Sequence, residues 1–131
     1  MNLLFVYGTL LPGQANWHVL APYVADEGWA DAAAGDLFDT GLGWPAAVFA
    51  DRAGQPVGRV VGRVVMLADA TLDVALAALD EFEGIHEGAY RRIAITTDGG
   101  HLAWAYHSGE PGESPAVAEG DWAAYVNKQN G

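Results

Sequence analysis

Residues 57–84 read VGRVVGRVVMLADATLDVALAALDEFEG and hold the strongest strand signal and the clearest helix signal of the chain. Valine dominates residues 57–67, and the even spacing of Arg59 and Arg63 directs both arginines to one face of the predicted strand. Residues 71–82 carry apolar side chains at helical spacing, which predicts an amphipathic helix packed on a core. The rest of the fold is inferred outward from this strand and this helix.

The predicted helix has defined ends. Asp69 or Thr71 can cap its start, and Gly84 follows at the position where a C-terminal cap glycine is expected. The apolar stripe that we expect to face the core consists of Leu72, Ala75, Leu76, Leu79 and Phe82.

On either side of this segment, short apolar runs alternate with turns. Strands are expected over residues 2–7, 33–38, 45–49, 90–97 and 102–107. The first of these has apolar side chains on both faces, so both faces are expected to be buried. Asp98-Gly99-Gly100 joins the last two as a hairpin turn. Short helical segments are expected over residues 16–23, where Asn16 can act as the cap, and 121–126.

This order of elements predicts an α+β fold. One main helix cannot cover the crossovers of a parallel sheet, so the strands favour an antiparallel or mixed arrangement. We expect a small mixed, largely antiparallel β-barrel with one main helix and short flanking helices. A length of 131 residues suits one domain over residues 1–131.

The charge balance excludes two classes of partner. Hydrophobic residues make up 51% of the chain, which rules out an intrinsically disordered protein. Six basic and 17 acidic residues give a net charge of −11. Nucleic-acid backbones and anionic membrane surfaces both attract basic proteins, so neither is an expected partner.

The chain contains no cysteine. Disulfides, thiolate metal sites and cysteine nucleophiles are therefore excluded, and a reducing compartment is favoured. No stretch approaches the ~20 apolar residues of a membrane span. The first residues have neither a basic region nor an apolar region typical of a signal peptide. A cytoplasmic location is expected.

Few residues are available for covalent catalysis. Ser108 and Ser114 lie in a polar loop outside any nucleophile motif, and the single lysine is Lys128. No phosphate-binding glycine motif occurs. We interpret the four histidines as surface residues, because they lack the spacing of metal ligands: His18, His86, His101 and His107. Neither a metal nor a cofactor is expected.

Glu83 is the acidic residue that the helical pattern separates from the others. At about 100° per residue, it projects within about 20° of Leu76, whereas Glu81 faces solvent. Three interpretations are open: the carboxylate reaches water where the helix ends, it pairs with Arg91 or Arg92, or it serves as a general base in a cavity. Burial would raise its pKa towards the ~6–7 that suits proton transfer, whereas an arginine partner would lower it.

The second feature is Tyr7-Gly8-Thr9-Leu10, which directly follows a buried strand. Gly8 allows a sharp turn and the close approach of a ligand. Successive N–H groups in such a loop can bind an anion. An ordinary turn from strand to loop is the alternative interpretation.

Seven segments carry a family resemblance between residues 3 and about 125. They are Phe5-Val6-Tyr7-Gly8-Thr9-Leu10 with Gly13 and Asn16, Gly35-Asp36-Leu37, Trp44-Pro45-Ala46, Val61-Gly62-Arg63-Val64-Val65, Leu79-Asp80-Glu81-Phe82-Glu83-Gly84, Tyr90-Arg91-Arg92 and Gly120-Asp121-Trp122. In this order they resemble the gamma-glutamylcyclotransferase-like (AIG2-like) family, nearest its gamma-glutamylamine cyclotransferase branch.

The resemblance implies a small mixed barrel and an enzyme that cyclises a γ-glutamyl group to 5-oxoproline with release of an amine. It implies Glu83 as the catalytic acid and base. It implies Tyr7, Gly8, Thr9 and Leu10 as substrate-binding residues, with Tyr90 as a further contact. The substrate's own α-amine is then the nucleophile, so the reaction needs neither a serine or cysteine nucleophile nor a metal.

Two other functions remain open at this stage. The same pocket could bind a γ-glutamyl-like metabolite without turning it over. A cyclotransferase could also act on a γ-glutamyl group carried by a large substrate. The partner expected in the first instance is a small γ-glutamyl molecule, and the sequence leaves the oligomeric state undefined.

Overall fold

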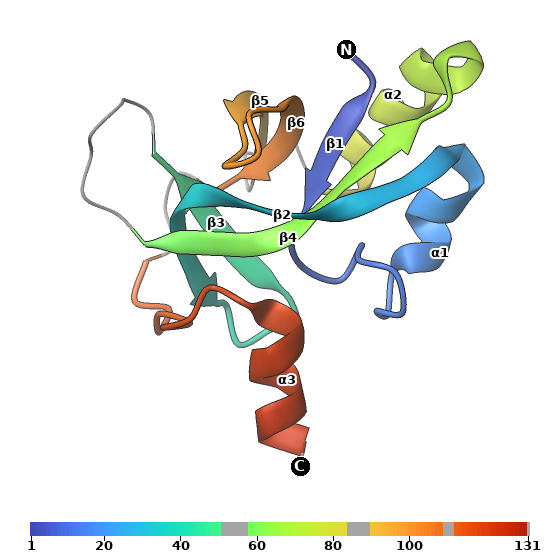
Figure 1. Ribbon diagram of the computed structural model, residues 1–131. Helices are drawn as coiled ribbons and strands as arrows, with labels where there is room; N and C mark the ends of the chain where they lie inside the picture. The colour runs from blue at the N-terminus through green and yellow to red at the C-terminus, as the bar shows by residue number, and fades with distance from the viewer. Residues whose placement is uncertain (51–57, 84–89, 109–111, 131) are drawn as a thin grey trace.

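The computed structural model describes residues 1–50, 58–83, 90–108 and 112–130. Within these residues the elements follow one another along the chain as shown in Figure 1. They are β1 (Leu3–Val6), α1 (Trp17–Leu20), the 3-10 turn η1 (Ala21–Tyr23), β2 (Val24–Asp39), β3 (Pro45–Phe49), β4 (Arg59–Leu67), the 3-10 turn η2 (Asp69–Thr71), α2 (Leu72–Phe82), β5 (Arg91–Thr96), β6 (Leu102–His107) and α3 (Trp122–Asn130).

The strands form one mixed sheet in the order β3-β2-β4-β1-β6-β5. Neighbours are antiparallel except β1 and β6, which are parallel. The sheet curls until β3 meets the end of β6. There the Ser108 N–H donates to the Ala47 carbonyl at 2.8 Å, and the Phe49 N–H donates to His107 Nδ1 at 3.1 Å. The predicted mixed, largely antiparallel barrel is confirmed.

Alternating residues of β1 separate two cores. Phe5 and Tyr7 point to the barrel interior, whereas Leu4 and Val6 pack in the layer outside it. All four side chains are buried. The expectation that residues 2–7 bury both faces is therefore confirmed, since a strand covered on both sides is apolar on both sides.

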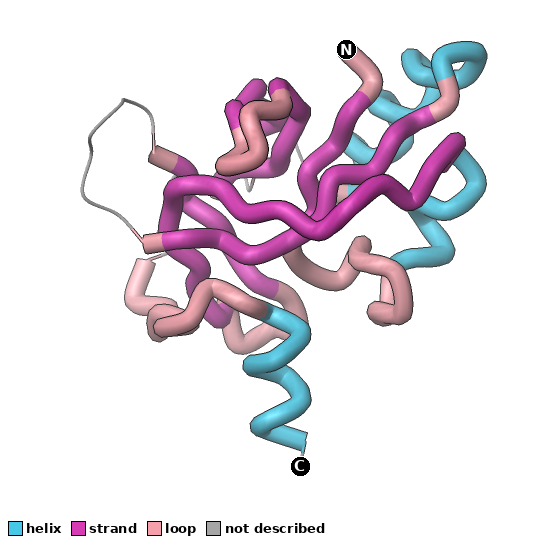
Figure 2. Tube along the Cα trace, viewed as in Figure 1, coloured by secondary structure: helices cyan, strands magenta, loops and turns pink. Residues whose placement is uncertain are grey.

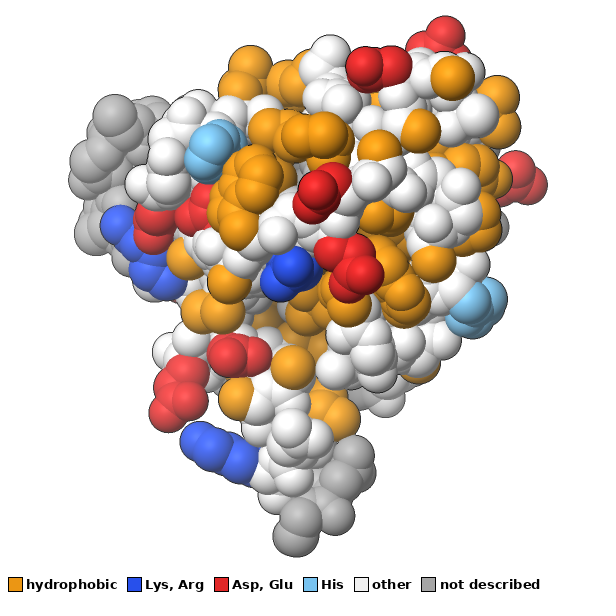
Figure 3. All heavy atoms as spheres, turned by 45° about the vertical axis from the view of Figure 1, so that its right-hand side comes forward, with side chains coloured by type: hydrophobic (Ala, Val, Ile, Leu, Met, Phe, Trp, Pro, Cys, Tyr) orange, Lys and Arg blue, Asp and Glu red, His pale blue; other side chains and the backbone are white. Residues whose placement is uncertain are grey.

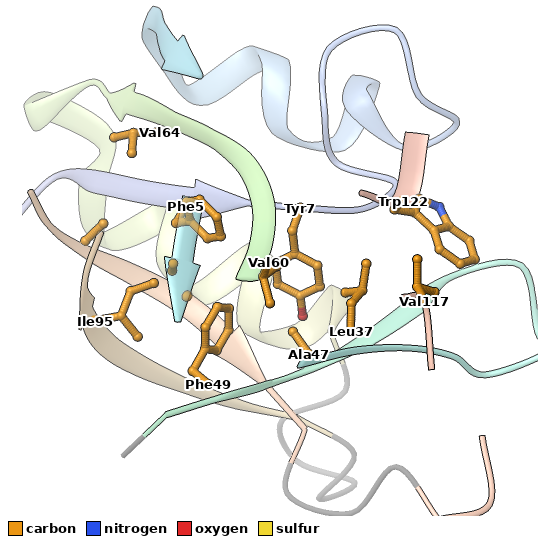
Figure 4. Packing of buried hydrophobic residues seen from close by; sticks show 13 residues of the cluster. Phe5, Tyr7, Leu37, Ala47, Phe49, Val60, Val64, Ile95, Val117 and Trp122 are labelled. Atoms are coloured by element: carbon orange, nitrogen blue, oxygen red, sulfur yellow. The ribbon is translucent and has the colours of Figure 1, made fainter. Parts of the chain in front are cut away.

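Aromatic rings fill the barrel interior (Figure 4). The ring of Phe49 meets Phe5 and Tyr7 edge-on, with centroids 6.1 and 5.7 Å apart. Val117 and Trp122 lie beyond Leu37 at one end of this cluster. Trp122 is the first residue of α3, so this helix anchors one end of the barrel.

The helices lie at the periphery of the sheet (Figure 2). Helices α1 and α2 contact each other on one side of the sheet, at the right of Figure 1, and α3 projects from the bottom of the molecule in this view. Leu20 of α1 and Leu79 of α2 are fully buried in the outer core. No helix in the described part of the chain combines the length and apolarity needed to cross a bilayer.

Strand β2 is much longer than the strand expected at residues 33–38. Its first half has a break in the ladder with β4, with register shifts between Val24 and Asp26 and between Asp26 and Trp29. Gly28 there has a φ of +69°. These shifts and the mainly exposed side chains remove the strict alternation by which a strand is recognised in sequence.

The ends of three helices also differ from expectation. Asn16 makes no capping bond, because its side chain donates to Thr9 Oγ1 at 2.9 Å. Thr71 stands at the N-cap of α2 without a side-chain bond. Helix α3 continues to Asn130, beyond the expected 121–126. The expected start of a strand at Val57, the cap role of Gly84 and the surface position of His86 lie outside the described residues.

Candidate active site

A cavity of about 590 Å³ opens between the loop after β1, the β2–β3 turn and the end of α2. Every residue that the sequence singled out for a site lines it. The lining comprises Phe5, Val6, Tyr7, Gly8, Thr9, Leu10, Asn16, Thr40, Leu42, Trp44, Pro45, Ala46, Phe82, Glu83, Tyr90, Tyr106 and Ser108.

Among the described residues that line this cavity, Glu83 is the one with a carboxylate. It stands at the C-cap of α2, where its N–H donates to the Leu79 carbonyl at 2.9 Å. Its side chain is largely removed from water, and this burial raises the pKa of Glu83 from 4.5 to about 7. Within the described residues, no cation forms an ion pair with it. The group can therefore accept and return a proton near neutral pH.

Arg92, two residues after Tyr90, binds side chains other than Glu83. Arg92 pairs with Asp80 through Nε–Oδ1 at 2.9 Å and Nη2–Oδ2 at 3.2 Å, and its guanidinium lies 4.5 Å from the centre of the Trp104 ring. Arg91 is exposed on the other face of the strand. Of the three interpretations of Glu83, pairing with Arg92 is wrong, and the carboxylate faces the cavity.

Three tyrosines form a hydrogen-bonded wall. The Tyr7 hydroxyl donates to the Tyr106 carbonyl at 2.6 Å, and the Tyr106 hydroxyl donates to Asp80 Oδ1 at 2.8 Å. The Tyr90 hydroxyl donates to the Pro45 carbonyl at 2.9 Å. Each phenolic proton is thus already engaged with the protein, which fixes the shape of the cavity.

The same tyrosines stay protonated. Burial, and then the charge of Glu83, raises the pKa of Tyr90 to about 12 and that of Tyr7 well above 10.0. Burial, followed by the hydrogen bond to Asp80, raises the pKa of Tyr106 as well. Of Glu83 and these three tyrosines, Glu83 is therefore the group that can exchange a proton near neutral pH.

The loop after β1 packs closely against Pro45 at Gly8. Gly8 does not have a positive φ. A Cβ atom there would lie 2.7 and 2.8 Å from Cγ and Cδ of Pro45. The absence of a side chain thus lets the loop pack against the start of β3. The chain also turns here as expected, with the Leu11 N–H donating to the Gly8 carbonyl, but the turn needs no left-handed conformation at Gly8.

In this loop, carbonyl groups accept hydrogen bonds, whereas three successive N–H groups do not donate any within the described chain. The Leu11 N–H donates to the Gly8 carbonyl at 3.1 Å, and the Asn16 N–H donates to the Thr9 carbonyl at 2.8 Å. The N–H groups of Gly8, Thr9 and Leu10 have no acceptor within the described chain. Three successive donors beside a cavity can bind a carboxylate or an oxyanion.

Sequence reasoning missed several lining residues. Phe82 was expected in the core but is 43% exposed at the cavity, because α2 ends there. Ser108 was placed in a polar loop but is buried where β3 meets β6. Alternation in residues 102–107 puts Trp104 and Tyr106 on one face, which is the signal that could have identified Tyr106.

The interpretation of the histidines as surface residues is wrong for His107. Its side chain is buried, and Nδ1 accepts the Phe49 N–H. His18 is exposed, and the His101 ring lies 4.6 Å from that of Trp29. Nowhere in the described residues do three His, Cys, Asp or Glu side chains gather as metal ligands would.

A comparison with protein families agrees with this architecture. The profile of the gamma-glutamyl cyclotransferase, AIG2-like family matches residues 4–124. The chain belongs to this family. A search of proteins with curated functions finds no significant match.

Solved structures share the fold. YkqA from Bacillus subtilis is 27% identical with a TM-score of 0.69; the match covers 98% of this chain and 42% of YkqA. YtfP from Escherichia coli is 28% identical with a TM-score of 0.62, covering 95% and 98% of the two chains. An AIG2-like protein from mouse is 22% identical with a TM-score of 0.61, covering 83% of this chain and 78% of its own.

Proposed function

We propose that the protein is a gamma-glutamyl cyclotransferase that converts a γ-glutamyl amine to 5-oxoproline and the free amine. The observation that carries the proposal is the largely buried Glu83 carboxylate, unpaired among the described residues. It lines a cavity that is also lined by Gly8, Thr9 and Leu10, whose backbone N–H groups have no acceptor in the described chain. Membership of the family supports the same reaction class.

The chemistry needs one group that moves a proton in both directions. Glu83 removes a proton from the α-ammonium of the substrate, whose pKa is about 8. The freed amine attacks the γ-carbonyl carbon and forms the new C–N bond of a five-membered ring. Protonated Glu83 then donates to the departing nitrogen as the original C–N bond breaks. The resulting Glu83 carboxylate takes the extra proton from the ring nitrogen and passes it to the released amine, which leaves as an ammonium ion. A pKa of about 7 suits both steps.

The loop at Gly8, Thr9 and Leu10 orients the substrate in this proposal. Its N–H groups bind the α-carboxylate or the oxyanion that develops on the γ-carbonyl oxygen. Holding the chain folded with the amine against the carbonyl supplies the proximity on which an intramolecular reaction depends. Tyr7 and Tyr90 act as rigid walls, because their hydroxyl protons are already engaged.

Mass-spectrometric detection of 5-oxoproline tests the proposal. Wild type and Glu81→Gln are expected to release it from a panel of γ-glutamyl amines, because Glu81 is exposed. Glu83→Gln is expected to lose a factor of about 10² to 10⁴ in kcat. Full turnover by Glu83→Gln would disprove the role of the carboxylate. A ligand that binds wild type but survives long incubation would instead indicate a binding module.

The pH dependence provides a second test. Glu83 must start ionised to act as a base, so kcat/KM is expected to rise with pH through an apparent pKa of about 7. The measurement is kcat/KM for one γ-glutamyl amine between pH 5 and 8. A flat profile over this range would contradict a base with a raised pKa.

A further inference from the structure

Large apolar side chains gather at the open part of this cavity. Leu42 is 66% exposed, and Trp44 and Phe82 are each 43% exposed. Of the seven large apolar side chains exposed in the described residues, these three line the same cavity. Exposed apolar surface that is concentrated at a cavity is typical of a binding site for an apolar group.

The turn that carries two of them is held in shape by its own hydrogen bonds. The Thr40 hydroxyl donates to the Trp44 carbonyl at 2.6 Å and accepts the Leu42 N–H at 3.2 Å. The Tyr90 hydroxyl donates to the carbonyl of Pro45, the residue that follows Trp44, and so ties the end of the turn to the cavity wall. Both apolar side chains are therefore presented by an organised turn.

No described cation lines the cavity. Five of the six basic residues are described, and all five lie elsewhere. Arg59 pairs with Asp98, Arg63 donates to the carbonyls of Glu27 and Gly28, Arg92 pairs with Asp80, Lys128 pairs with Glu119, and Arg91 is exposed. On the face in Figure 3, acidic side chains are widespread and basic ones lie in a few places.

The cavity offers different surroundings to the glutamyl part and to the leaving part of a γ-glutamyl substrate. The α-carboxylate of the glutamyl part can use the free N–H groups after β1. A second carboxylate, on a leaving part that lies at Leu42, Trp44 and Phe82, would meet apolar side chains and would find no cation among the described lining residues. An unpaired charge in such surroundings is unfavourable.

We infer that, given the proposed function, the leaving group is an apolar amine without a carboxylate, such as an alkylamine or arylalkylamine, and that Leu42, Trp44 and Phe82 select it. Amino acids are excluded as leaving groups by the same contacts. The bond that breaks and the proton that moves are those of the reaction above.

Matched substrates test the inference. γ-Glutamyl-phenethylamine and γ-glutamyl-phenylalanine differ only by a carboxylate, and γ-glutamyl-methylamine lacks the apolar group. We expect kcat/KM for the phenethylamine compound to exceed that of each of the others by about tenfold or more. Equal or greater turnover of γ-glutamyl-phenylalanine would overturn the inference and leave the cyclotransferase reaction intact. No turnover of any compound would overturn the proposed function and the inference together.

Variants locate the selectivity. Leu42→Arg is expected to supply the missing cation and to raise kcat/KM for γ-glutamyl-phenylalanine relative to the phenethylamine compound. Leu42→Ser and Trp44→Ala are expected to lower the preference for phenethylamine over methylamine. Leu102→Ser is the control, because Leu102 of β6 has an exposed fraction between those of Leu42 and Trp44 but does not line the cavity. Unchanged ratios in all three cavity variants would overturn the inference.

Discussion

At the scale of single residues, Glu83 is an ionisable group in surroundings that disfavour its negative charge. A carboxylate at a helix C-terminus faces the negative end of the helix dipole, and burial adds to this cost by raising its pKa to about 7. Such a cost to stability is common at sites where activity requires it.

This cost predicts a pH-dependent stability effect. The folded pKa of Glu83 is raised, so its favourable contribution is full below about pH 4.5 and is lost as the pH rises through about 7. Glu83→Gln carries no charge at any pH. At pH 8 this substitution is expected to raise the free energy of unfolding, relative to wild type, by about 2–3 kcal/mol more than it does at pH 5.

Urea unfolding of both proteins at both pH values measures the effect, and Glu81→Gln provides the control for an exposed carboxylate. An equal change at pH 5 and pH 8 would contradict the raised pKa, because a simple packing effect does not depend on pH.

Gly8 leads to a second prediction at this scale. In Gly8→Ala the new methyl group would overlap the ring of Pro45. We expect a loss of about 1–3 kcal/mol in unfolding free energy and a lower kcat/KM, because the loop must shift. The double variant Gly8→Ala/Pro45→Ala is expected to recover part of the stability, since it removes the overlapping atoms. A strictly additive double mutant would refute this contact.

At the scale of elements, α2 and β5 share one ion pair that affects the cavity. Asp80 lies one turn from Glu83 on α2, on the same side of the helix. Its pairing with Arg92 of β5 makes the two charges neutral as a unit. Breaking the pair from either side would leave one net charge near Glu83.

The two single variants should therefore act in opposite directions. Asp80→Asn releases the positive charge of Arg92 and is expected to lower the apparent pKa of kcat/KM below about 7, by about one unit. Arg92→Met leaves Asp80 unpaired and is expected to raise it. Shifts in the same direction would indicate that both variants act through loss of structure. Circular dichroism at the assay temperature checks that each variant is folded.

The elements also show where sequence patterns suffice. Helix α2 was expected over residues 71–82 and spans Leu72–Phe82, because its apolar stripe repeats with the helical period. Strand β2 was underestimated because Gly28 and two register shifts interrupt its alternation. Local periodicity identifies regular elements, and a bulge hides the strand that contains it.

At the scale of the whole molecule, α3 stabilises the barrel from outside the cavity. Trp122 is buried in the interior core and stacks on Tyr125, whose hydroxyl bonds to Asp39 at 2.6 Å. Trp122→Ala is expected to cost about 3–5 kcal/mol of unfolding free energy. Because Trp122 does not line the cavity, kcat/KM well below the melting temperature should stay unchanged.

Thermal unfolding and kinetics on the same sample test this separation. Val74→Ala, on the exposed face of α2, is the control and is expected to change neither quantity. A fall in kcat/KM for folded Trp122→Ala would show that the end of the barrel and the cavity are coupled.

The sequence by itself determined the positions of most strands and of the main helix and the exclusion of a cysteine nucleophile, and it singled out Glu83 as a candidate. Each of these depends on composition or on neighbours within a few positions. Only the tertiary structure decided that Arg92 pairs with Asp80 and that Tyr106 and His107 are buried partners. Tyr7 and Tyr106 are 99 residues apart, and the parallel pairing of β1 with β6 brings them into contact. The partners of a side chain across such a separation follow from which strands pair, which no local pattern specifies.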